Sequence, residues 1–168
     1  MLRVTRLIAG RAWLPALLLS IWPVGLPAMA DPAARLDVLS SGGEILVSVP
    51  MPEGQGWCLA WNHSVEGFEV LDCYRHRQGR MVLTRSHLPD FAAGLDHVPG
   101  RGRQVSDGNG GYWIEAIDEP VPGNAYRLRV GSLAVDHRLV VGGEPISLSR
   151  LAENQRVTIR LVPSPASP

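Results

Sequence analysis

WCLAWNHSVEGFEVLDCY, from Trp57 to Tyr74, is the stretch that decides the fold. It holds both cysteines of the 168-residue chain and two of its five tryptophans. We read it as an antiparallel hairpin in which Cys58 faces Cys73. The other cross-strand pairs are then Trp57 with Tyr74, Leu59 with Asp72, Trp61 with Val70 and His63 with Phe68.

Side chains alternate between the two faces of a strand, so this register sorts the hairpin into an apolar face and a polar face. Asp72 is the one discordant member of the apolar face, which is predicted to be core. The apolar face consists of Trp57, Leu59, Trp61, Phe68, Val70 and Tyr74. The opposite face carries Cys58, Ala60, Asn62 and Ser64, with Glu66 at the turn.

The first thirty residues read as an export signal. Arg3, Arg6 and Arg11 form a positive region, an apolar stretch follows over 13–26, and 28–30 is a small-x-small cleavage pattern. A retained N-terminal anchor is the alternative, although two prolines interrupt an apolar stretch that is short for a span of about 20 residues. After cleavage no membrane insertion is expected.

The charge of the chain is balanced, with 16 acidic and 16 basic residues, so electrostatic attraction gives no reason to expect nucleic acid as a partner.

Residues 31–162 suit a single domain, and the tail 163–168 is predicted to be disordered. A monomer is expected. An exported chain with two cysteines predicts a Cys58–Cys73 disulfide.

Short β-rich segments separated by Gly- and Pro-containing turns predict the fold class. About nine short antiparallel strands are expected, which is typical of an all-β, single-domain β-sandwich or a partly open barrel. Besides the hairpin, the expected strands cover 35–39, 44–49, 80–86, 112–117, 126–130, 133–141 and 156–162. Residues 149–154 are expected to form one helical turn. Residues 87–111 are expected to be a long loop, packed around 91–95 and mobile over 101–111.

Asn62, Ser64 and Glu66 form the sharpest polar cluster, with His63 beneath it. Because the three alternate, their side chains leave one face near the hairpin end, where they could bind a small polar solute. The alternative is a self-satisfied turn in which Ser64 and Glu66 cap backbone N–H groups. His63 and Ser64 point to opposite faces, which disfavours a nucleophile and its base, and His63 is expected to be a core histidine.

No spacing typical of a metal site is present, and no cofactor is expected. The candidate ligands are His63, His76, His87, His97, Asp90 and Asp96. Surface histidines are the preferred interpretation, with His87 and His97 in the long loop. Residues 107–110 are similar to the start of a calcium loop but lack its later glutamate. Trp57, Trp61 and Trp113 are expected to be core rather than an exposed platform.

The segment Trp61-Asn62-His63-Ser64-Val65-Glu66 resembles the signature of the bacterial family called domain of unknown function 1850. The order of the following segments, 68–74, 80–85 and 92–95, agrees with that family, and the resemblance covers about residues 36–162. Asp72 stands roughly where the family tends to carry glutamate, and Ala92 where it usually has glycine. The resemblance implies a small exported all-β protein. Because many members are encoded near TRAP transporters of the TAXI type, it also implies an accessory role in periplasmic solute uptake.

These observations favour a periplasmic protein that binds a ligand and does not catalyse a reaction. A TRAP/TAXI transporter subunit or a small polar solute is the expected partner, and the candidate site residues are Asn62, His63, Ser64 and Glu66. Two alternatives stay open. One is a small periplasmic enzyme that uses Glu66 as acid or base, and the other is a structural module of the envelope.

Overall fold

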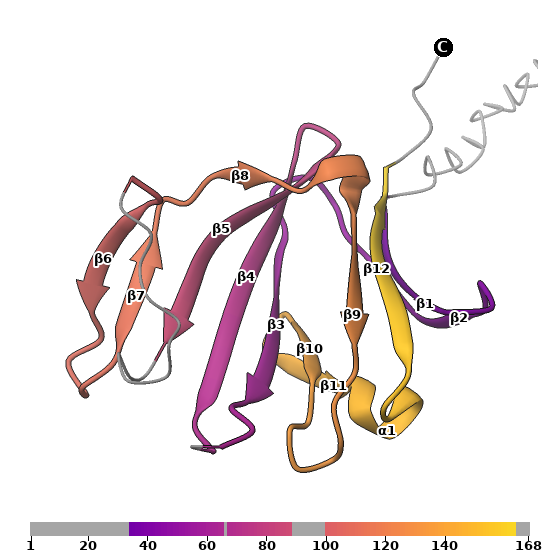
Figure 1. The fold of residues 1–168 in the computed structure, drawn as a ribbon. Coiled ribbons are helices and arrows are strands. Elements are labelled where there is room, and N and C mark those ends of the chain that lie inside the picture. The colour runs from indigo at the N-terminus through magenta and orange to yellow at the C-terminus, as the bar shows by residue number, and fades with distance from the viewer. Residues whose placement is uncertain (1–33, 66, 89–99, 164–168) are drawn as a thin grey trace, which may run out of the picture.

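The protein folds into two antiparallel β-sheets that pack face to face (Figure 1). The structure is a computed structural model and describes residues 34–65, 67–88 and 100–163. The smaller sheet has the order β2-β1-β12-β9, formed by Ile45–Pro50, Arg35–Ser40, Arg156–Val162 and Ala125–Arg129. The larger sheet has the order β11-β10-β3-β4-β5-β7-β6, formed by Glu144–Ser147, Arg138–Val141, Gly56–Asn62, Glu69–Arg77, Arg80–Leu88, Tyr112–Glu115 and Arg103–Ser106.

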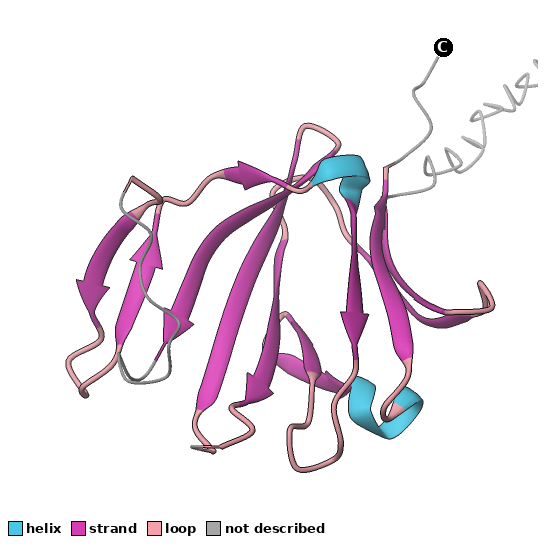
Figure 2. Cartoon of the chain, viewed as in Figure 1, coloured by secondary structure: helices cyan, strands magenta, loops and turns pink. Residues whose placement is uncertain are grey.

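The predicted all-β class is confirmed. Strand β8 (Glu119–Pro120) pairs with β5 and completes an eight-stranded larger sheet. The described helical structure is one α-helix, α1 (Leu148–Ala152), and one 3-10 turn, Pro122–Asn124 (Figure 2). The described strands form two open sheets and not a closed barrel. In Figure 1 the larger sheet reaches leftward to β7 and β6, away from the smaller sheet at the right.

The core lies between the two sheets, and a column of stacked aromatic rings in it links one sheet to the other. Trp57 on β3 stacks on Tyr74 of β4 at 5.6 Å between ring centroids, and Tyr74 stacks on Tyr126 of β9 at 5.1 Å. Leu36 on β1 and Leu139 on β10 are fully buried on either side of the interface. The column therefore ties the two sheets together through apolar burial, which is the main stabilising term in such a sandwich.

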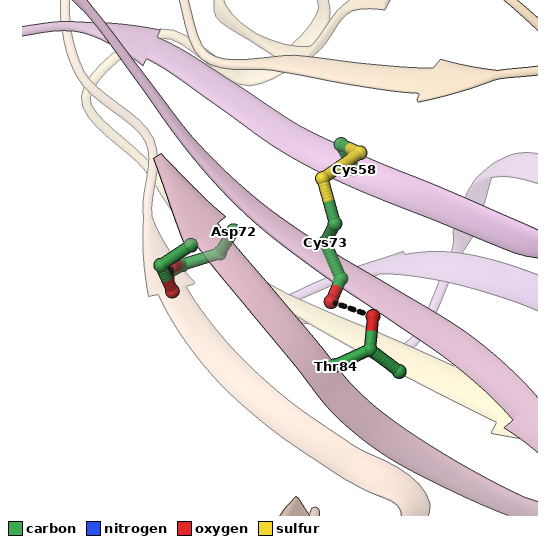
Figure 3. Close-up of a disulfide and its surroundings, with 5 residues drawn as sticks. Cys58, Asp72, Cys73 and Thr84 are labelled. Atoms are coloured by element: carbon green, nitrogen blue, oxygen red, sulfur yellow. Dashed lines mark hydrogen bonds between the residues drawn. A yellow bond between two sulfur atoms is a disulfide. The ribbon is translucent and has the colours of Figure 1, made fainter. Parts of the chain in front are cut away.

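The central hairpin has the register that the sequence predicts. Cys58 pairs with Cys73, and the pairs Trp57–Tyr74, Leu59–Asp72 and Trp61–Val70 follow. The cysteines form a disulfide with their Cα atoms 4.0 Å apart. Figure 3 shows the disulfide and the hydrogen bond of 2.9 Å from the Thr84 hydroxyl to the Cys73 carbonyl. His63 continues the same register, since its N–H donates to the Phe68 carbonyl.

The prediction of one strand over 133–141 is wrong for its first part. The strand β10 begins only at Arg138, and residues 131–137 turn back on themselves. Asp136 adopts a left-handed φ of 45°, which a strand does not allow, and the Gly131 N–H is held by Nδ1 of His137. The strand predicted over 112–117 ends at Glu115 for the same reason, because Ala116 has a φ of 53°.

The prediction that 101–111 is mobile is also wrong, because β6 lies within it and pairs with β7. The described strands number twelve rather than nine, since β6, β8 and β11 were not predicted. The helical turn predicted near 149–154 is present as α1, one residue earlier at its start. The segment 91–95, the export signal, Glu66 and the tail from 164 onward lie outside the described residues.

Two histidines are not the surface groups that the sequence predicts. His76 is 5% exposed, and its Nδ1 lies 2.8 Å from the carbonyl oxygen of Met51. His87 lies on β5 and not in a loop, with Nε2 2.8 Å from a carboxylate oxygen of Asp107. That carboxylate also accepts the N–H groups of Asn109 and Gly111, so Asp107 organises a turn. These contacts assign His76 and His87 to the scaffold.

The disulfide should contribute measurably to stability. It closes a separation of 15 residues, which predicts a loss of about 3 kcal/mol in the free energy of unfolding on reduction. Urea denaturation with and without reductant measures this loss. The variant carrying Cys58→Ser and Cys73→Ser serves as the control and should be insensitive to reductant. Free thiols in protein isolated from an oxidising compartment would contradict the bond.

The two hairpin tryptophans should differ in their contributions to stability. Trp57 is 2% exposed, whereas Trp61, predicted to be core, is only partly buried. Trp57→Ala should cost about 3 to 5 kcal/mol of unfolding free energy, as for other large-to-small core changes. Trp61→Ala should cost clearly less, because less surface returns to water. Equal losses in urea denaturation would contradict this difference in burial.

Candidate functional site

A carboxylate lies on the core-facing side of the larger sheet. The register of neighbouring strands places one row of side chains across the inner face of that sheet. The row consists of Leu139, Leu59, Asp72, Ser86 and Ile114. Leu139, Leu59 and Ile114 are buried core residues. Asp72 therefore occupies a position that the sheet otherwise fills with apolar side chains, which is unusual for an acid.

Asp72 is only partly compensated at this position. Its carboxylate accepts a hydrogen bond of 2.6 Å from the Ser86 hydroxyl. Burial raises the pKa of Asp72, while the Ser86 hydrogen bond and the charge of Arg101 act in the opposite direction. Burial raises the pKa of Tyr74, and the Asp72 charge adds to this shift. A negative charge held in this apolar setting is the most distinctive electrostatic feature of the inner face.

A cavity of about 210 Å³ opens beside this carboxylate. Its walls combine one acid, one hydroxyl and one guanidinium with apolar side chains, which is the composition typical of small-molecule sites. The described residues that line it are Trp61, Val70, Asp72, Ser86, Leu88, Arg101 and Ile114. They come from β3, β4, β5, β7 and the residue pair before β6, so the cavity exists only once the sheet has formed.

Arg101 is brought to the cavity by a close backbone approach. Gly102 has a φ of 71°, and a Cβ atom there would lie 2.5 Å from the carbonyl oxygen of Glu115, so only glycine fits. The Arg101 guanidinium donates to Glu119 through Nε at 2.8 Å and Nη2 at 2.9 Å. This pairing raises the pKa of Arg101 and lowers that of Glu119.

Trp61 joins the cavity to a histidine that the sequence analysis did not single out. The rings of Trp61 and His137 stack with centroids 6.0 Å apart. Nδ1 of His137 accepts the Gly131 N–H at 2.9 Å, and the Ser149 hydroxyl oxygen accepts the backbone N–H of His137 at 3.0 Å. Burial lowers the pKa of His137, so its imidazole is neutral at pH 7. A neutral ring places no positive charge behind Trp61.

The structure distributes the predicted site residues over the end of the hairpin. Asn62 donates its N–H to the Val135 carbonyl at 2.7 Å and its amide to the Ala134 carbonyl at 3.2 Å. His63 stacks on Phe68 at 5.0 Å, and Ser64 is exposed. Of the four predicted residues, Glu66 lies outside the described part of the chain. Asn62, His63 and Ser64 do not line this cavity, nor do they line the groove on the opposite face of the larger sheet.

Asn62 belongs to a polar network that anchors the loop 131–137. Arg138 donates to Asp136 at 2.8 Å, to Glu69 at 2.5 Å and to the side-chain oxygen Oδ1 of Asn62 at 3.4 Å. The Ser147 hydroxyl donates to Asp136 at 2.6 Å, and these bonds lower the pKa of Asp136. The network explains how Asn62 is held without a ligand.

The opposite face of the larger sheet carries a wider groove of about 590 Å³ around the disulfide. Three arginines and two carboxylates are among the residues that line it, and Arg77 pairs with Asp118 at 2.7 Å. Arg85 lies 4.3 Å from the centre of the Trp113 ring. These side chains are largely exposed to solvent, and water therefore screens their charges. We therefore place the candidate site in the inner cavity.

Sequence reasoning noticed Asp72 as discordant but did not assign it to the site. Ser86 and Arg101 carried no signal in the sequence, because each reaches Asp72 only through strand pairing or a backbone turn. Among the described residues, no three His, Cys, Asp or Glu side chains lie together as a metal site would require. No helix in the described part of the chain is long and apolar enough to cross a membrane.

The fold and the cavity define a two-sheet, all-β protein with a carboxylate-bearing pocket on the inner face of its larger sheet. The family model described as "Domain of unknown function (DUF1850)" matches residues 58–148, which is more than half of the chain. The chain belongs to this family. The match runs from β3 to the start of α1 and includes every described residue of the cavity. No curated protein and no solved structure is significantly similar to the chain.

The raised pKa of Asp72 predicts a pH-dependent stability effect. A carboxyl whose pKa is higher in the folded than in the unfolded state contributes stability below its unfolded pKa, near 4, and loses it as the pH rises. Asp72→Asn removes this pH-dependent contribution to stability and keeps an oxygen that accepts the Ser86 hydrogen bond. Relative to the wild type, the variant should therefore gain in unfolding free energy as the pH rises above about 4. A pH-independent difference in urea denaturation would contradict the shift.

Proposed function

We propose that this protein is an exported ligand-binding accessory of solute uptake, with the inner cavity at Asp72 as its binding site. The observation that carries the proposal is the position of Asp72 in the core-facing row between Leu59 and Ser86. A charge at such a position costs folding free energy, because burial penalises the ionised form. That cost is accounted for if the carboxylate serves a ligand.

Several features of the cavity favour binding over catalysis. Asp72 is hydrogen-bonded to Ser86, but no described histidine or lysine lines the cavity to activate that hydroxyl. The cavity has apolar walls and a few convergent polar groups, an arrangement that orients a small molecule. The alternative enzyme that uses Glu66 would need a second site at the hairpin end.

The cellular role in this proposal rests on three further observations. The Cys58–Cys73 disulfide is compatible with an oxidising compartment outside the cytoplasm. The N-terminal sequence has the pattern of an export signal. The resemblance of the signature region to a family often encoded near TAXI-type TRAP transporters suggests the transporter as partner. We therefore propose that the protein presents or retains a small solute for that class of transporter.

Recovery of a bound compound tests the proposal. Protein isolated in its native form should release one small molecule on denaturation, detectable by mass spectrometry. Val70→Phe narrows the cavity and should abolish retention, because Val70 lines it and is buried. Val140→Phe, in the groove on the opposite face, is the matched control and should retain the compound.

Turnover and transport distinguish the remaining alternatives. A binding protein returns the compound unchanged after prolonged incubation, whereas a converted compound would favour the enzyme. Loss of solute uptake in cells carrying Val70→Phe, with normal uptake for Val140→Phe, would support the transport role. A compound retained equally by both variants would place the site elsewhere and contradict the proposal.

A further inference from the structure

The charges at the inner cavity do not balance. Among the described residues that line it, Asp72 and Arg101 are the charged ones. Arg101 is already matched, because two of its guanidinium nitrogens donate to the two carboxylate oxygens of Glu119. A bidentate pair of this kind neutralises the guanidinium locally and holds it in one orientation. Asp72 then feels Arg101 only as a nearby charge, and among the described residues no cation forms an ion pair with it.

The hydrogen bonding of Asp72 agrees with this imbalance of charge. An ionised carboxylate offers about four acceptor sites on its two oxygens. Within the described part of the chain, one donor, the Ser86 hydroxyl, bonds to it, at Oδ1. Among the described residues, the neighbouring walls formed by Trp61, Val70 and Ile114 donate no second hydrogen bond to Asp72. The carboxylate therefore has acceptor capacity that faces an apolar-walled space.

We infer that the ligand of this cavity carries a positively charged group, an ammonium or amidinium, that pairs with Asp72 while its apolar body packs on Trp61, Val70 and Ile114. This inference rests on the proposed function and names the chemical class of its ligand. A charge pair formed inside an apolar cavity is stronger than the same pair in water. The Ser86 hydroxyl keeps the carboxylate oriented toward such a group.

The size of the cavity limits the apolar body. An apolar cavity of about 150 Å³ in a protein is known to accept benzene. A volume of about 210 Å³ therefore accommodates a single ring or a short branched chain with one amino group. The neutral His137 behind Trp61 leaves the indole free to attract a cation, since a charged histidine there would repel it.

Three matched probes test the charge of the ligand. Benzylamine, benzyl alcohol and benzoate share a ring and differ in carrying a positive, a neutral and a negative group at neutral pH. Calorimetric titration of the full, disulfide-bonded protein should show benzylamine binding about 10- to 100-fold more tightly than benzyl alcohol, the range expected for a hydrogen bond to a charged group. Benzoate should bind most weakly of the three.

Charge variants assign the preference to named residues. Asp72→Asn should bring the affinity for benzylamine down to that for benzyl alcohol. Glu119→Gln should also weaken the binding of benzylamine. Arg101 then loses its ion-pair partner, and the positive charge of Arg101 repels that of the ligand. Asp118→Asn is the matched control, since this neighbouring carboxylate pairs with Arg77 instead. It should leave all three affinities unchanged.

The outcomes separate this inference from the proposed function. A preference for benzoate that Arg101→Gln abolishes would overturn the inference, while the cavity would still be a ligand site. A benzylamine preference that survives Asp72→Asn would overturn it as well. If none of the probes binds, the cationic ligand is rejected, and the compound recovered from native protein then decides the proposed function independently.

Discussion

The pairing of β3 with β4 is the constraint on which the rest of the structure depends. Both strands lie in the middle of the eight-stranded sheet, with β10 on one side and β5 on the other. The period of side-chain direction in a strand is two, so a slip of one residue would exchange the core face and the outer face. The Cys58–Cys73 bond prevents such a slip covalently. This register fixes which side chains lie next to one another across the inner face, including those beside Asp72.

The same register explains how a charge comes to lie on the core face. Cys58 and Cys73 occupy the outer face, and their neighbours Leu59 and Asp72 therefore point inward. At Leu59 this direction leads into the packed core, whereas at Asp72 it leads to a cavity. The larger sheet extends past the smaller one toward β7 and β6 (Figure 1), so the smaller sheet does not cover the whole of its inner face.

The two polar groupings of the protein differ in how completely they are satisfied. At the hairpin end, Arg138 links Asp136, Glu69 and Asn62 in a network that closes on itself. In the cavity, Asp72 has a single bonded donor among the described residues. Satisfied networks stabilise and specify a fold. The half-buried Asp72 carboxylate, by contrast, keeps acceptor sites that a ligand can fill.

The sequence alone determined the all-β class, the disulfide and the register of the central hairpin, because alternation and cysteine pairing are local properties of the chain. It also marked Asp72 as discordant. It did not predict β6 or β11, the start of β10 at Arg138, or the burial of His76. The tertiary structure decided these features, since they depend on left-handed turns and on partners distant in sequence. The tertiary structure also decided the cavity, because Ser86 and Arg101 come near Asp72 only when β4, β5 and the chain before β6 lie close together.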